Sequence, residues 1–235
     1  MEKTGTLYLI PLPIAEDALQ TLSPAVTTKT SEVTHFFVEN LRTARRFLKA
    51  LHPSIIIDSL HFSAIDKHKG ADIPTLKKWL KAGIDVGIMS ESGCPGIADP
   101  GSELVAVAQD LNAAVIPLVG PNSIILALMA SGLNGQSFCF HGYLPVKEPF
   151  RSQRIKHLEQ LSKKENQTQI FIETPYRNNQ MVDDFLKNCN DHLRLCIAQN
   201  ITAENQLIKT RTIAAWKKQK PSLEKVPTVF LFLDL

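Results

Sequence analysis

Residues 84–123 read IDVGIMSESGCPGIADPGSELVAVAQDLNAAVIPLVGPNS, and this stretch decides the fold class. An apolar run, Ile84–Met89, is followed by twelve residues that contain three glycines and two prolines. A helical segment, Glu103–Leu111, then leads to a second apolar run, Ala114–Val119. The order strand, Gly/Pro loop, helix, strand is typical of a parallel sheet covered by helices, so the sequence predicts an α/β fold.

The same alternation extends on both sides of this stretch. Upstream, we expect strands at Thr6–Ile10, His35–Val38 and Ile55–Ile57, with helices at Asn40–Leu51 and Pro74–Ala82. Downstream, the expected elements are helices at Ile124–Ala130, Gln153–Leu161 and Asn178–Lys187, and strands at Gln169–Glu173, Leu193–Ala198, Leu207–Thr210 and Thr228–Leu233. Some downstream strands follow one another with no helix between them, which indicates a mixed sheet.

The sequence therefore predicts two α/β domains, the first with a parallel sheet and the second with a mixed sheet. The Gly- and Pro-rich segment Ser131–Pro145 is the expected junction, which places the domains at residues 1–131 and 132–235.

Composition excludes several classes of protein. The chain has 235 residues, of which 44% are apolar and 21% charged, as in ordinary globular proteins. No apolar stretch is long enough to span a bilayer, and the first residues lack a signal-peptide pattern. The four cysteines have no CxxC spacing, and the histidines form no metal-ligand pattern. We expect a cytoplasmic protein with reduced thiols, no metal and no membrane partner.

The net charge of +3 is unevenly distributed. Residues up to Leu118 carry eleven Lys and Arg against thirteen Asp and Glu, whereas the remainder carries fifteen against ten. The richest basic stretch is Pro145–Lys164. Such a segment suits contact with a phosphate backbone, and a solvated helix face is the alternative interpretation.

The loop at residues 90–101 follows a predicted parallel strand at its carboxyl end, where α/β proteins bind ligands. Two similar loops, at residues 11–13 and 120–123, follow other predicted strands, so the three should converge. A plain structural turn is the alternative for the first loop. The chain has no GxGxxG and no Walker A motif, so dinucleotide and P-loop sites lack support.

The set of motifs resembles the tetrapyrrole methylase superfamily of S-adenosylmethionine-dependent methyltransferases and, within it, the ribosomal RNA small subunit methyltransferase I family. That family's loop reads close to SDAGTPGISDPG, and this chain has SESGCPGIADPG at 90–101. The family segments GPSA, FGFLP and ESPHR correspond to GPNS at 120–123, HGYLP at 141–145 and ETPYR at 173–177. The family's opening LYLVxTPIGN resembles Leu7–Ile14, and its EDTR resembles ENLR at 39–42.

The resemblance implies a cofactor cleft between two domains, a homodimer, and S-adenosylmethionine as cofactor with S-adenosylhomocysteine as product. It implies an RNA substrate, with 2′-O-methylation of a ribose in small-subunit ribosomal RNA. The cofactor-binding positions that it implies are Leu12, Pro13, Glu91, Ser92, Gly93, Cys94, Ser123, Ile124, Glu173, Thr174 and Pro227.

Several residues are candidates for the remaining roles. A ribose hydroxyl is a poor nucleophile, so a base or cation should assist it, and the candidate catalytic residues are Glu91, Glu39 and Lys147. Guanidinium groups suit phosphate or carboxylate, which makes Arg42, Arg151, Arg154 and Arg177 the substrate-binding candidates. Arg45 and Arg46 are expected to face solvent. For each candidate catalytic residue an ordinary role, such as capping a helix or orienting the cofactor, is the alternative.

The chain departs from the family pattern within these loops. Glu91 replaces an aspartate, Asn40 replaces another, and the Gly-Asn pair of the opening motif is missing. Two other functions therefore stay open: methylation of a tetrapyrrole or other small molecule, and a binding paralogue with altered catalysis.

Overall fold

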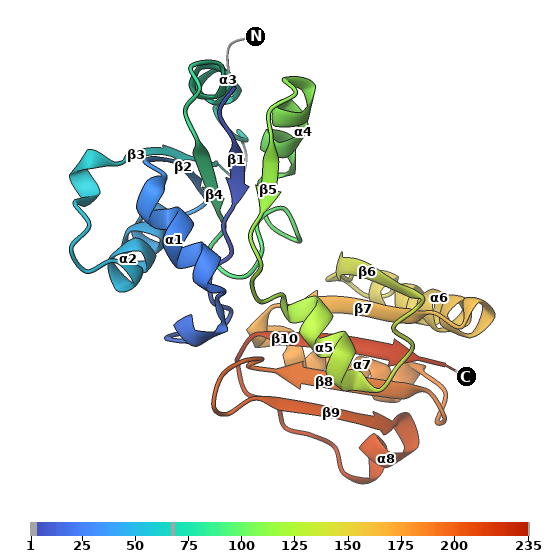
Figure 1. The fold of residues 1–235 in the computed structure, drawn as a ribbon. Helices are drawn as coiled ribbons and strands as arrows, with labels where there is room; N and C mark the ends of the chain where they lie inside the picture. Colours follow the sequence, from blue (N-terminus) through green and yellow to red (C-terminus); the bar gives the residue numbers. More distant parts are fainter. Residues whose placement is uncertain (1–3, 67–68, 235) are drawn as a thin grey trace. The chain divides into compact units, whose positions relative to one another are not determined.

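The computed structural model describes residues 4–66 and 69–234, and the chain divides after Asn122 into two compact units (Figure 1). The N-terminal residues 1–3, part of the argument against a signal peptide, lie outside the described residues. Among the described residues, no helix is both long and apolar enough to cross a membrane.

The first unit contains a parallel sheet with the strand order β3-β2-β4-β1-β5. Its strands are β1 (Leu7–Leu9), β2 (His35–Val38), β3 (His61–Ala64), β4 (Val86–Met89) and β5 (Val115–Pro117). Because all five run in one direction, the loops that follow them emerge at the same edge of the sheet.

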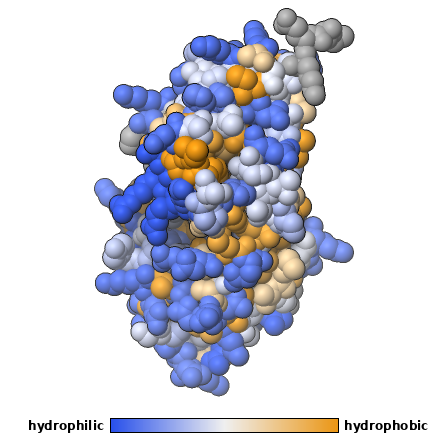
Figure 2. Space-filling model, turned by 60° about the vertical axis from the view of Figure 1, so that its left-hand side comes forward, coloured by the Kyte–Doolittle hydropathy of each residue, from blue (hydrophilic) through white to orange (hydrophobic). Residues whose placement is uncertain are grey.

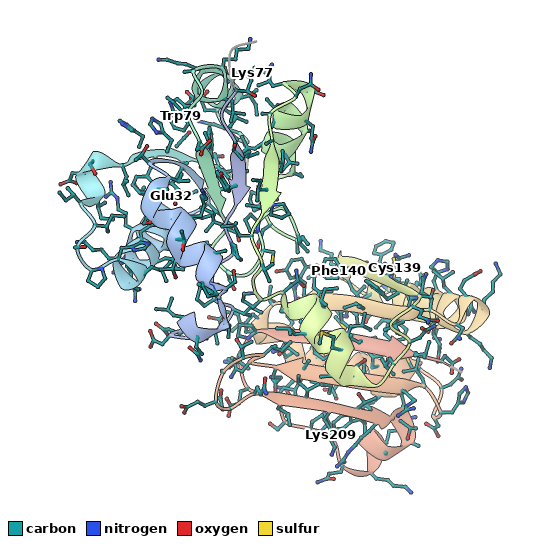
Figure 3. The ribbon with its side chains drawn as sticks, in the orientation of Figure 1. Glu32, Lys77, Trp79, Cys139, Phe140 and Lys209 are labelled. Carbon is teal, nitrogen blue, oxygen red and sulfur yellow. The ribbon has the colours of Figure 1, made fainter. Side chains whose placement is uncertain are left out.

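Helices cover both faces of this sheet because its strands are apolar on both faces. Phe36 and Val38 pack in a cluster with α1 (Pro24–Glu32) and α2 (Leu41–Leu51), beside the short 3-10 helix η1 (Leu19–Thr21). Phe37, between them, packs in a second cluster with α3 (Ile73–Lys81) and α4 (Ser102–Asp110), which includes the half-buried Trp79 (Figure 3). This arrangement confirms the predicted parallel α/β sheet.

The strand predicted at Ile55–Ile57 is wrong. Residues Ile57–Ser59 form the 3-10 helix η2, and the edge strand β3 begins at His61. Ile55 and Ile57 pack against the α2 side of the core from this connection, while Ile56 is 70% exposed. A β-branched run can therefore fill a core from a loop as well as from a strand.

The second unit contains a mixed sheet with the strand order β6-β7-β10-β8-β9. Its strands are β6 (Phe138–Tyr143), β7 (Thr168–Glu173), β8 (Arg194–Gln199), β9 (Leu207–Thr212) and β10 (Thr228–Leu233). Strands β6 and β7 are parallel, and the other neighbours are antiparallel, as the sequence predicts for a mixed sheet. The edge strand β6, which carries Cys139 and Phe140 (Figure 3), lies within the segment expected to be a linker.

Successive residues of β10 face opposite sides of this sheet. Phe230 and Phe232 point to a core under α6 (Phe150–Glu165), α7 (Asn178–Asn188) and α8 (Ile213–Lys218), and η3 (Pro175–Arg177) precedes α7. Val229 and Leu231 face α5 (Ser123–Ser131).

Helix α5 belongs to the second unit because its buried side chains, including Ile124 and Leu128, pack on the second sheet. The Oγ1 of Thr210 also donates to the carbonyl of Ser131 at 2.6 Å. The units therefore divide after Asn122, whereas the sequence-based boundary after residue 131 assigned this helix to the first domain.

Candidate functional site

Residues 90–101 connect β4 to α4 in a loop held by its own backbone. The amide of Gly96 donates to the carbonyl of Pro100 at 3.1 Å. Gly93 has φ +68° and Gly101 has φ +131°, which are conformations that L side chains rarely adopt. The Gly- and Pro-rich sequence thus presents a defined set of backbone groups at the carboxyl end of β4.

The loops after β1, β4 and β5 pack against one another, and we call residues 11–13, 90–94 and 120–122 the ridge. Leu12 and Gly93 exchange both backbone hydrogen bonds, at 2.9 and 3.1 Å. Gly120 lies so close to Pro11 that a Cβ atom there would stand 2.3 Å from ring atoms of the proline. The three loops that were expected to converge therefore lie together.

Two of the three candidate catalytic residues meet at the ends of β2 and β4. The Oε2 atom of Glu39 accepts a hydrogen bond from the amide of Glu91 at 3.1 Å. The amide of Glu39 in turn donates to the carbonyl of Met89 at 3.1 Å. Glu39 thus holds the start of the 90–101 loop, while the third candidate, Lys147, lies exposed in the second unit.

Asn40, which stands where the family motif has aspartate, caps helix α2. Its Oδ1 atom accepts from the amides of Arg42 and Thr43 at 3.0 and 3.2 Å. The side chain of Arg42 is exposed at the first turn of the helix. The asparagine that replaces the family aspartate at position 40 therefore preserves the cap at the start of α2.

Cys94 is a neutral packing residue of the ridge. Its Sγ atom donates to the carbonyl of Pro121 at 3.3 Å. Burial raises the pKa of this thiol above its usual value, so the thiolate that nucleophilic chemistry needs is disfavoured.

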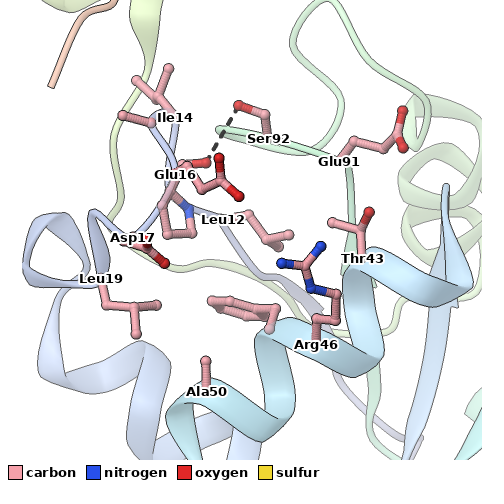
Figure 4. Close-up of a pocket in the computed structure, with 13 residues that line it drawn as sticks. Leu12, Ile14, Glu16, Asp17, Leu19, Thr43, Arg46, Ala50, Glu91 and Ser92 are labelled. Carbon is pink, nitrogen blue, oxygen red and sulfur yellow. Dashed lines mark hydrogen bonds between the residues drawn. The ribbon is translucent and has the colours of Figure 1, made fainter. Parts of the chain in front are cut away.

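A cavity of about 300 Å³ lies beside the ridge, between the loop after β1 and helix α2; we call it cavity A. Its residues are an apolar group, Leu12, Leu19 and Phe47, and a polar group that includes Glu16, Asp17, Arg46 and Glu91. Figure 4 shows the Arg46 guanidinium pointing into this space. At the rim, Ser92 Oγ donates to the carbonyl of Pro13 at 3.4 Å.

A second cavity of about 370 Å³, cavity B, lies beside Cys94 on the other part of the ridge. Leu9, Ile97, Val105 and Leu118 contribute to its lining. No charged side chain lines cavity B among the described residues, whereas cavity A has an arginine and three carboxylates.

The remaining predicted cofactor-binding residues belong to the second unit. Ser123 and Ile124 begin α5, with Ile124 buried. Glu173 is buried at the end of β7 and accepts from the amide of Thr174 at 2.6 Å. Pro227 directly precedes β10. The part that these residues take in cofactor binding stays a prediction.

Two of the four candidate substrate arginines are held in ion pairs. Arg151 is buried, and its Nε atom lies 2.6 Å from Oδ2 of Asp184. Arg177 contacts the buried carboxylate of Glu173, with Nε at 3.0 Å and Nη2 at 2.5 Å from Oε1. These guanidinium groups therefore have structural partners in their own unit.

Arg154 is oriented by a chain of side chains. The Nε2 atom of His141 lies 2.6 Å from Oε1 of the buried Gln169, whose amide nitrogen donates to the carbonyl of Gln167. His141 therefore donates through Nε2, which leaves Nδ1 to accept from Nη2 of Arg154 at 3.3 Å. Burial lowers the pKa of His141, which favours the neutral ring that this arrangement requires.

Arg46 is exposed, as the sequence predicts, but sequence reasoning did not identify it as a residue that lines a cavity. A signal was present: Thr43, Arg46, Phe47 and Ala50 recur at helical spacing, so they share one side of α2. All four line cavity A. Among the described residues, no group of three His, Cys, Asp or Glu side chains could hold a metal ion.

Comparisons with known proteins agree with this architecture. No family model matches the chain. It matches the methyltransferase CobJ with TM-score 0.61 and 18% identity, covering 98% of this chain and 95% of that one. It also matches uroporphyrin-III C-methyl transferase from Thermus thermophilus, complexed with S-adenyl homocysteine, with TM-score 0.56 and 14% identity, covering 98% of each chain. The fold is that of the tetrapyrrole methylase superfamily.

Relatives that match by sequence identify the family within this fold. Ribosomal RNA small subunit methyltransferase I of Buchnera aphidicola subsp. Schizaphis graminum is 32% identical over 237 residues, covering 100% of this chain and 80% of the relative. The protein of the same name from Vibrio cholerae serotype O1 is 28% identical over 228 residues, covering 96% and 76%. The chain belongs to the ribosomal RNA small subunit methyltransferase I family.

Proposed function

We propose that the chain transfers the methyl group of S-adenosylmethionine to RNA of the small ribosomal subunit, at a ribose 2′ oxygen. The observation that carries the proposal is the similarity along the whole chain to ribosomal RNA small subunit methyltransferase I. The ridge at the carboxyl edge of a parallel sheet supports it, because ligands of α/β proteins bind there.

The ridge and cavity B fit S-adenosylmethionine. The apolar lining of cavity B suits the faces of an adenine ring. Among the residues predicted to bind the cofactor, Cys94 lines cavity B, whereas Leu12, Pro13, Glu91 and Ser92 line cavity A. In the second unit, Ser123, Ile124, Glu173, Thr174 and Pro227 stay predicted cofactor residues. When bound, the cofactor supplies a methyl group on a positively charged sulfur.

Glu91 is the best candidate for the proton acceptor among the predicted catalytic residues. Glu91 is among the residues that line cavity A, and its amide donates to the Glu39 carboxylate at 3.1 Å. A carboxylate at that position can take a proton from a hydroxyl group, and Glu39 acts as the residue that positions the loop.

The second unit supplies groups for contact with RNA. Its excess of basic residues includes the exposed Lys147, and Arg154 is oriented by His141. Tyr176 is 81% exposed, and Lys225 Nζ lies 5.6 Å from its ring centroid. An exposed aromatic ring beside a cation suits stacking on an unpaired base.

The proposal includes a cytoplasmic location and a homodimer. Apolar patches interrupt the hydrophilic surface on the face seen in Figure 2. Met129 on α5 is 75% exposed and Phe138 on the edge strand β6 is 41% exposed, which supports association with a second copy. Light scattering on the purified chain tests this part, and a monomeric mass at micromolar concentration would exclude the dimer.

Two measurements test the proposed activity. Calorimetric titration with S-adenosylhomocysteine should show saturable binding, and purified small subunits from a strain that lacks the gene should accept a tritiated methyl group on RNA. Binding without methyl transfer to RNA would favour a small-molecule acceptor such as a tetrapyrrole. Absence of binding at millimolar ligand would indicate a paralogue without this enzyme activity.

A further inference from the structure

Cavity A is lined by charged residues of opposite sign. Arg46 lines it together with Glu16 and Asp17 (Figure 4). Within residues 4–66 and 69–234, none of these three side chains forms a hydrogen bond or an ion pair. A guanidinium near two carboxylates would ordinarily pair with one of them. All three residues are exposed, so their charged groups are accessible to a ligand that enters cavity A.

The loop after β1 holds one of the carboxylates through its backbone. Asp17 has φ +60°, the left-handed conformation, which costs a residue other than glycine about 1 kcal/mol. Aspartate tolerates this conformation better than most residues. The acidic side of cavity A is thus built by a constrained turn.

The floor of cavity A is apolar and closed. Phe47 is 6% exposed and Leu12 is 2% exposed, and both contribute to the lining. An apolar floor bordered by a donor group and acceptor groups complements a flat ring that carries acceptors and an amino group on its edge. Nucleobases with an amino group have this chemistry.

We propose, on the basis of the function proposed above, that cavity A receives the base of the acceptor nucleotide, turned out of the RNA stack. Arg46 donates to acceptor atoms of the ring, and Glu16 and Asp17 accept from its amino group. The base must leave the stack because side chains cannot reach all of this edge inside a helix. Glu91, on the same cavity wall, then lies near the attached ribose.

The test compares two neighbouring arginines of α2. Arg46→Ala removes the guanidinium in cavity A, while Arg45→Ala removes one that lies 5.6 Å from the Phe62 ring centroid, outside the cavity lining. Both variants lose one positive charge from the same helix, so they change general attraction to RNA equally. The substrate is small subunits from a strain that lacks the gene, with tritiated S-adenosylmethionine.

We expect Arg46→Ala to lower kcat/KM for the small subunits by about 10- to 100-fold, and Arg45→Ala by less than about threefold. The dissociation constant of S-adenosylhomocysteine should stay within about twofold for both variants. Equal losses for both arginines would overturn the proposal, since they would indicate general electrostatics. Weaker S-adenosylhomocysteine binding in Arg46→Ala would also overturn it, because cavity A would then hold the cofactor.

A second variant tests the space itself. Ala50 lines cavity A from an exposed position on α2, so Ala50→Phe can fold and fill the cavity. We expect methyl transfer to RNA to fall at least tenfold with S-adenosylhomocysteine binding retained. Unchanged transfer would refute occupancy of cavity A. If the wild-type chain binds no S-adenosylhomocysteine, the proposed function itself fails, which is a different outcome from either result.

Discussion

Replacing Gly120 by alanine should separate two loops of the ridge. An alanine Cβ would stand 2.3 Å from both Cβ and Cγ of Pro11, whereas ordinary contacts lie at 3.4–4 Å. The proline ring cannot rotate away, so the loops after β1 and β5 must part by about 1 Å or more. Overpacking of this kind costs about 1–3 kcal/mol.

The change also has a stabilising component, which sets the expected net effect. Gly120 has no positive φ, so alanine at that position restricts the unfolded chain and contributes about 0.4–1 kcal/mol. We therefore expect a net loss of about 1–2 kcal/mol in the free energy of unfolding. S-adenosylhomocysteine should also bind more weakly, because Leu12 and Gly93 move with the displaced loops.

Gly135→Ala is the matched control. A Cβ atom at Gly135 would meet nothing within 4 Å, and its φ is not positive, so the same substitution should be neutral or slightly stabilising. Urea unfolding followed by tryptophan fluorescence in a Trp216→Phe background reports the first unit through Trp79, because the chain has two tryptophans. Gly135 lies in the second unit, so it controls for the effect of the substitution itself, and the stability of the first unit is compared with that of the unsubstituted Trp216→Phe background. If Gly120→Ala is as stable as that background, the close contact between the loops is refuted.

Three further predictions concern stability and thiol reactivity. Asp184→Ala removes the buried carboxylate that pairs with the buried Arg151 and should lower the free energy of unfolding by about 3–5 kcal/mol in urea titrations. Glu148→Ala, which removes the exposed partner of the same arginine, should leave it nearly unchanged. Burial lowers the pKa of His141 in the folded chain, so on acidification the unfolded chain binds a proton at this histidine before the folded chain does. The free energy of unfolding should therefore fall as pH drops through about 6.5. His141→Gln should make this pH dependence shallower between pH 7 and 5 in urea titrations. Burial raises the pKa of the Cys189 and Cys196 thiols, so these two thiols should resist Ellman's reagent at pH 8 until urea unfolds the chain. Rapid reaction of all four thiols in the folded chain would contradict this prediction.

The fold was predictable where the hydrophobic pattern and the turn residues agree. The stretch 84–123 shows both, and the strand, loop, helix and strand expected there are confirmed. The run Ile55–Ile57 failed because composition alone does not distinguish a strand from a loop that packs on a core. Strand β6 was missed because its glycine and the turn residues beside it suggested a linker, whereas its backbone pairs with β7.

The candidate site was predictable at the level of loops and less so at the level of side chains. Backbone features such as the Leu12–Gly93 pairing follow from Gly- and Pro-rich loops at the ends of parallel strands. Whether an arginine faces solvent, a carboxylate or a cavity depends on tertiary neighbours. Arg151, expected to contact substrate, is buried against Asp184, and Arg46, which is exposed as expected, also lines cavity A.

The departures from the family motifs affect the two sides of the ridge differently. Asn40 still caps α2, and Glu91 still donates its amide to Glu39, so both changes preserve the backbone on which the loops depend. The side chains that differ, Glu91 and the residues that replace the Gly-Asn pair at 15–16, line cavity A, whereas cavity B has none of them. Divergence concentrated on cavity A should change the choice of acceptor before it changes cofactor binding. The affinity for S-adenosylhomocysteine therefore reports on cavity B, and the rate of RNA methylation reports on cavity A as well.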